Sequence, residues 1–199
     1  FQLYSSARIT CSDGEKIPKY WDPGLQQEYG KFIKEFGRQF NGDPRISFLE
    51  VGVGIYGETQ PSDDKYDSCV ASAGLTSDLW VSYAKWVIDQ YTAAFPDTQL
   101  VIEYAPTFSK PCERKQITDY AYSKGVGLQH SGLSPDSVGN NVIDDPTRSD
   151  YQCGLFDPIL KYWDKIVTGW ETYVTDPDPD AENVQTLWRL LSALDKHAD

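Results

Sequence analysis

The chain has 199 residues and a formal net charge of −12, which comes from 30 acidic and 18 basic side chains. That length is typical of a single domain with a sizeable core. The acidic excess argues against nucleic acid and anionic membranes as partners, because phosphate groups are bound by Lys and Arg. No apolar run approaches the roughly 20 residues that cross a bilayer. A chain that opens at Phe1 without a signal peptide suggests a processed or excerpted protein.

The spacing of apolar residues predicts a strict alternation of strands and helices. Strands are predicted over residues 1–9, 45–53, 99–104, 125–130 and 166–170. Helices are predicted to begin at Asp22-Pro23, Ser77, Glu113, Asp157-Pro158 and Glu182. Alternation of this kind predicts an α/β fold with a parallel sheet and right-handed crossovers. Five such units indicate either a (β/α)8-type barrel that lacks some of its eight units or a small open sheet.

Several common sites are missing from the sequence. It has no glycine-rich nucleotide loop and no Walker motif. No His and carboxylate cluster has the spacing of metal ligands, and no Gly-x-Ser-x-Gly elbow is present. We therefore expect no metal and no cofactor, and an α/β-hydrolase triad is disfavoured.

The four cysteines are Cys11, Cys69, Cys112 and Cys153. Their wide spacing does not suit a zinc site and favours two disulfides in an oxidising compartment. Three pairings are open from the sequence. Four buried free thiols in a cytosolic protein are the alternative.

Functional groups of parallel α/β folds gather at the carboxyl ends of the strands. Glu58 follows the second predicted strand and Glu171 follows the fifth, each beside glycine and aromatic residues. Glycoside hydrolysis needs one carboxyl group as acid and a second as nucleophile or base. The six Trp and thirteen Tyr also suit a protein that stacks on sugar rings, although part of them will fill the core.

The motifs around these glutamates resemble those of barrel glycoside hydrolases of the broad β-galactosidase-like clan. The N-terminal similarity lies in residues 17–21, 42–46 and 54–62, the last reading GIYGETQPS. The C-terminal similarity lies in residues 169–173 (GWETY), 187–188 and 193–197. The resemblance implies that residues 1–199 form one barrel domain, equivalent to barrel strands three to seven. The first two units and the last would then be absent.

The same resemblance implies the roles of individual residues. Glu58 would be the general acid/base and Glu171 the nucleophile of a retaining O-glycosyl hydrolase. The residues that would contact the sugar are Trp21, Tyr56, Tyr104, His130, Trp170 and Tyr173. Glu50 and Glu103 lie within strands, where a supporting hydrogen-bonding role is expected. One departure is Gly57, which stands where the clan commonly has an Asn that binds the sugar 2-hydroxyl.

Together these observations predict a secreted, extracellular glycoside hydrolase that acts on an oligo- or polysaccharide. Two alternatives stay open: a carbohydrate-binding barrel without catalysis, and an inactive fragment of a larger glycosidase. His130 as a core histidine and Trp170 as a packing residue are the alternatives to sugar contact.

Overall fold

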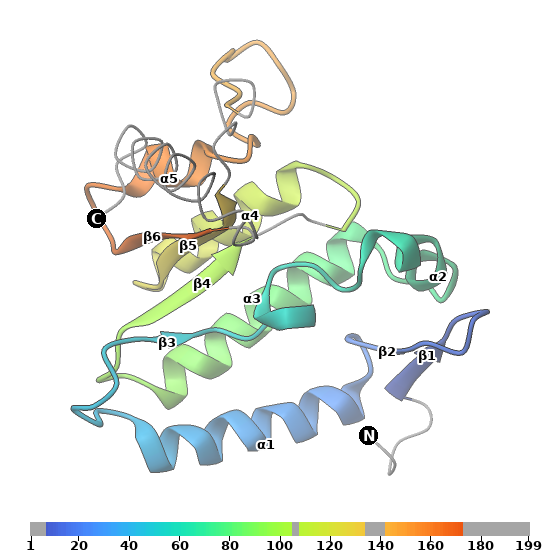
Figure 1. The fold of residues 1–199 in the computed structure, drawn as a ribbon, viewed down its shortest axis with the longest axis horizontal. Coiled ribbons are helices and arrows are strands. Elements are labelled where there is room, and N and C mark those ends of the chain that lie inside the picture. Colours follow the sequence, from blue (N-terminus) through green and yellow to red (C-terminus); the bar gives the residue numbers. More distant parts are fainter. Residues whose placement is uncertain (1–6, 105–107, 134–141, 173–199) are drawn as a thin grey trace, which may run out of the picture.

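The computed structural model describes residues 7–104, 108–133 and 142–172 of the chain. Four strands form a parallel sheet in the order β3-β4-β5-β6, and helices alternate with them (Figure 1). The sheet strands are β3 (Leu49–Glu50), β4 (Leu100–Tyr104), β5 (Gly127–Leu133) and β6 (Thr168–Thr172). The α-helices are α1 (Pro23–Phe40), α2 (Asp67–Ser72), α3 (Ser77–Ala94), α4 (Cys112–Ser123) and α5 (Asp157–Tyr162). The short elements are β1 (Arg8–Thr10), β2 (Lys16–Pro18), η2 (Ile55–Gly57) and η3 (Asp64–Tyr66).

The helix starts follow the sequence signals. Asp22 accepts a hydrogen bond from the Leu25 amide, and Pro23 opens α1. Thr76 caps α3 in the same way through the Leu79 amide. The predicted helices at Ser77, Glu113 and Asp157-Pro158 are confirmed within one residue, whereas the predicted helix at Glu182 lies outside the described residues.

The strands of the sheet follow one another in chain order, with no reversal. Because parallel crossovers are almost always right-handed, a sheet built in one direction carries its helices on one face. The contacts agree, since α1 packs on α3, α3 on α4, and α4 on α5. This sequential order is that of a barrel segment, and it differs from the doubly wound sheet, in which the strand order reverses. The described residues form an open four-stranded sheet, so a closed barrel stays a prediction.

The start of the chain differs from the prediction of a first parallel strand over residues 1–9. Arg8–Thr10 pairs antiparallel with Lys16–Pro18 in a separate two-stranded sheet. The turn between them includes Gly14, whose φ of +91° belongs to the left-handed region that glycine adopts freely. The chain therefore turns back on itself before it can join the main sheet. Residues 1–6 lie outside the described part.

Two disulfides brace the loops at the carboxyl ends of the strands. Cys11 pairs with Cys69, which ties the β1–β2 hairpin to α2. Cys112 pairs with Cys153, which ties the start of α4 to the segment before α5. The two disulfides predicted from the sequence are thus present, and their pairing is settled. Closing loops of 58 and 41 residues stabilises the fold by about 4 kcal/mol each in the chain-entropy account. Such bonds are typical of proteins from oxidising compartments.

Candidate functional site

The alternation of side chains along the strands separates two faces of the sheet. Glu103 on β4 pairs in register with Gln129 on β5, which pairs with Gly169 on β6. Glu171 lies two residues beyond Gly169 and so points to the same face as Glu103. Glu50 on β3 pairs with Val101, two residues before Glu103, and shares that face as well. Three carboxyl groups from three strands therefore project from one side of the sheet, opposite the helices.

The three carboxyl groups meet around Glu103. Its carboxyl group is within hydrogen-bonding contact of those of both Glu171 and Glu50. Glu103 is only 4% exposed, whereas Glu50 is half-buried and Glu171 is exposed. We call this group of three the carboxylate cluster.

Burial, together with the neighbouring Glu171 and Glu50 carboxyl groups, raises the pKa of Glu103 to about 9. The Glu103 Oε1 atom is buried and has no donor among the described residues. An ionised Glu103 would thus face two acceptors, whereas a protonated Glu103 can donate to one of them. The cluster is arranged to hold a proton at neutral pH.

Glu58 directly follows Gly57, at the end of η2. The Gln60 side chain donates a 2.6 Å hydrogen bond to Glu58 Oε2, and Glu58 is half-buried. The preceding residue, Gly57, has φ +92°, and a Cβ atom there would lie 2.6 Å from Glu50 Oε1. The Glu50 carboxyl therefore occupies the space that a side chain at position 57 would need, which gives a physical reason for glycine where the resemblance implied Asn.

The loop that carries Glu58 is fixed by long-range hydrogen bonds from the core. The Trp80 Nε1–H donates to the Thr59 carbonyl at 2.9 Å, and Trp80 is fully buried. The Tyr20 hydroxyl donates to the Pro61 carbonyl at 2.9 Å. These two donors hold the backbone on the C-terminal side of Glu58, so that backbone is tied to α3 and to the segment before α1.

The aromatic residues predicted to contact sugar at the strand ends lie on the other face. Tyr104 and His130 are 0% and 1% exposed, and their rings meet edge to face at 5.3 Å. Trp170 packs 5.1 Å from His130, and Phe156 completes the group. Because Tyr104, His130 and Trp170 each stand one position from a residue of the cluster face, their side chains point toward the helices. This placement favours the alternative in which His130 and Trp170 pack the core.

The same buried group contains several polar atoms that lack partners among the described residues. They are the Tyr104 hydroxyl, both ring nitrogens of His130, and the Trp170 Nε1. Burial, together with the nearby Arg114 charge, lowers the pKa of His130 to about 3. His130 is therefore neutral at physiological pH.

The remaining predicted contact residues lie elsewhere. Trp21 is half-buried against the core, and the Lys19 Nζ lies 5.5 Å from its ring centre. Tyr56 is 76% exposed and has a positive φ of 56° within η2, two residues from Glu58. Among the predicted contact residues, Tyr56 is the nearest to Glu58 in the sequence. Tyr173 lies outside the described residues.

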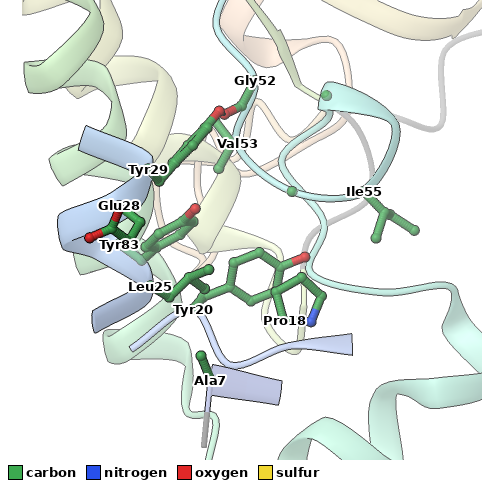
Figure 2. Close-up of a pocket in the computed structure, with 12 residues that line it drawn as sticks. Ala7, Pro18, Tyr20, Leu25, Glu28, Tyr29, Gly52, Val53, Ile55 and Tyr83 are labelled. Carbon is green, nitrogen blue, oxygen red and sulfur yellow. The ribbon is translucent and has the colours of Figure 1, made fainter. Parts of the chain in front are cut away.

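A cavity of about 670 Å³ adjoins the cluster at Gly57. Figure 2 shows Tyr20, Tyr29 and Tyr83 along this cavity, between α1 and the loop after β3. The Tyr29 hydroxyl donates to the Gly52 carbonyl at 2.6 Å, which leaves the ring as the available surface. Since Gly57 lines the cavity and also lies against the Glu50 carboxyl, the apolar space and the cluster meet at one residue.

The loop after β4 is held by Glu113, which is fully buried. Its carboxylate accepts hydrogen bonds from the Phe108 amide at 2.8 Å and from the Ser109 amide and hydroxyl. The adjacent Cys112–Cys153 disulfide fixes the same turn. Phe108 and Ser109 are thereby anchored to the start of α4.

Within residues 7–104, 108–133 and 142–172, no three His, Cys, Asp or Glu side chains are arranged to hold a metal ion. None of the helices in the described ranges is long and apolar enough to cross a membrane.

Neither the protein-family models nor the curated proteins compared with the sequence give a match. The fold and the site by themselves define a class: a disulfide-braced α/β protein with a sequentially ordered parallel sheet and a carboxylate cluster on the face away from its helices.

Proposed function

We propose that the protein is a glycoside hydrolase that cleaves O-glycosidic bonds of an oligo- or polysaccharide. The observation that carries the proposal is the carboxylate cluster, in which an exposed Glu171 lies beside the buried Glu103, whose pKa is raised by burial and by its carboxyl neighbours. Glycoside hydrolysis uses carboxyl groups whose environments keep one protonated and another ionised. In this proposal Glu171 is the nucleophile and Glu58 the general acid/base, as the resemblance implies.

The cavity beside Gly57 supports a substrate with a flat, partly apolar face. Its volume falls within the range of about 300–1,000 Å³ that is usual for small-ligand sites. Sugar rings present CH faces that pack on aromatic side chains, and Tyr20, Tyr29 and Tyr83 line this space. Tyr56 is exposed beside the same loop and is available for contact with a longer chain. A polysaccharide substrate and the two disulfides are both consistent with a secreted protein.

Hydrolysis of a panel of aryl glycosides and natural oligosaccharides tests the proposal, with Glu58→Gln and Glu171→Gln beside the parent protein. Loss of general acid/base catalysis lowers kcat by about 10²–10⁴-fold, and we expect a loss at least as large at Glu171. Glu15→Gln is the matched control, because Glu15 is exposed in the β1–β2 hairpin. Equal activity of all four proteins would contradict the assignment.

The stereochemistry of the product separates the two mechanisms. A retaining enzyme has its two carboxyl groups about 5–5.5 Å apart, and an inverting enzyme about 6.5–9.5 Å apart. We expect retention of the anomeric configuration, followed by NMR of the first-formed sugar. Inversion would place a water molecule, and not Glu171, in the attacking role.

The second candidate is a carbohydrate-binding protein without catalysis. It is favoured by Gly57, where the Glu50 carboxyl lies in the space of a side chain that would reach a sugar hydroxyl. A sugar-binding isotherm without turnover, unchanged in Glu171→Gln, would support this candidate over the hydrolase.

A further inference from the structure

The strongest unassigned feature is the middle carboxyl group of the cluster. Glu103 is 4% exposed, and its Oε1 atom has no donor among the described residues. The groups that face it are Glu50 from β3, the neutral Gln129 from β5, and Glu171 from β6. Glu58 lies beyond Gly57 and is bonded to Gln60.

Three ionised carboxyl groups in contact would repel one another, so the cluster is expected to keep at least one proton. The site for that proton follows from exposure. Glu171 is exposed and Glu50 half-buried, so water stabilises their charged forms better than that of Glu103. A protonated Glu103 also has an O–H group, which can donate a hydrogen bond to one of its two carboxyl neighbours.

We propose that Glu103 is a positioning residue that carries a proton at neutral pH and donates it in a hydrogen bond to the Glu171 carboxylate. This bond fixes the orientation of the Glu171 carboxyl group at the end of β6. Glu103 is too buried to reach a substrate from its place in β4, and it acts through Glu171. The catalytic consequence rests on the proposed function, whereas the hydrogen bond does not.

The first test uses stability and needs no substrate. Burial raises the pKa of Glu103 from 4.5 to about 9, so the folded protein binds a proton there that the unfolded chain releases. The stability from this proton is complete below pH 4.5 and is lost as the pH rises toward 9. Relative to Glu103→Gln, the unfolding equilibrium constant of the parent protein should rise by up to about tenfold per pH unit in this window.

Two variants make this measurement specific. Glu171→Gln removes one of the two negative neighbours, so the window should move to lower pH. Glu15→Gln, which alters an exposed carboxyl group of the hairpin, should leave the window unchanged. A constant stability difference between the parent and Glu103→Gln from pH 5 to 9 would overturn the proposal.

The second test uses activity. Deprotonation of Glu103 should lower the activity of the parent protein near pH 9. Glutamine retains an N–H donor for Glu171, so Glu103→Gln should keep kcat within a few-fold of the parent and should not show this decline. Leucine has no donor, and loss of a hydrogen bond to a charged group should lower kcat about 10–100-fold. Equal loss in both variants would overturn the positioning role. If no protein in the series hydrolyses a glycoside but the pH window is present, the hydrogen bond stands and the proposed function fails.

Discussion

The two faces of the sheet are built from neighbouring residues of the same strands, yet they have opposite chemistry. Tyr104 and His130 follow Glu103 and Gln129 by one position, and they lie in the core beneath the helices. Glu103 points away from the helices toward two other carboxyl groups. A position at a strand end therefore does not by itself define a site, because successive side chains point to opposite faces of the sheet.

The two faces also differ in the pH at which their buried titratable groups become charged. On the helix face, His130 stays neutral, since burial lowers its pKa. On the other face, Glu103 stays neutral because burial and like charges raise its pKa. Both groups avoid a buried charge, but His130 becomes charged by protonation at low pH, whereas Glu103 becomes charged by deprotonation at high pH.

The largest effect is expected from Ile102→Ala on the helix face. Ile102 is fully buried between its strand neighbours and the helices, so truncation removes apolar contacts and leaves a cavity. We expect a loss of about 2–5 kcal/mol in the free energy of unfolding, measured by denaturant titration. Val167→Ala is the control, because Val167 is 48% exposed and should change stability by less than about 0.5 kcal/mol. Equal losses would contradict the assignment of the core.

The next effect concerns acid stability and His130→Phe. The unfolded chain binds a proton near pH 6.5, whereas folded His130 binds it only near pH 3. The contribution of the neutral ring is therefore complete above pH 6.5 and lost as the pH falls toward 3, by up to about 1.4 kcal/mol per pH unit. Phenylalanine fits the aromatic group and does not titrate, so the variant should lose less stability than the parent in this window. Parallel stability curves for the two proteins would contradict it.

Most of the secondary structure could be predicted from the sequence. The helices and the four parallel strands follow from apolar periodicity and from local caps such as Asp22 and Thr76. The antiparallel hairpin was missed because residues 8–10 have the composition of a strand, and only the turn at Gly14 redirects them. The disulfide pairing depends on long-range contacts that no local pattern contains.

For the site, the sequence identified the strand ends and Glu171 but did not predict the contacts among the three glutamates. The parity of Glu103 and Glu171 relative to the predicted strands was available as a signal. The register that brings Glu50 beside Val101 was not, because it depends on how β3 pairs with β4. Tyr104, His130 and Trp170 were predicted near the glutamates because they stand at strand ends, but the alternation of side chains directs them to the other face, where they pack together.

The smallest effect comes from two glycines with nearly equal backbone angles. Gly57 has φ +92° and Gly14 has φ +91°, so alanine should cost each position about 1 kcal/mol of backbone strain. At Gly14 the added methyl group meets open space, whereas at Gly57 it lies 2.6 Å from Glu50 Oε1. Glu50 must then turn away from the cluster, and the pH window of Glu103 should shift downward in Gly57→Ala but not in Gly14→Ala. Thermal unfolding across pH measures both effects, and an unshifted window in both variants would contradict the role of Glu50.

The most direct test is an NMR titration of the glutamate carboxyl carbons in protein labelled at glutamate. The proposed cluster predicts one signal that titrates near pH 9 and is missing in Glu103→Gln. If every glutamate carboxyl group instead titrates in the ordinary range near pH 4.5, the cluster holds no proton at neutral pH and the account of this face is wrong.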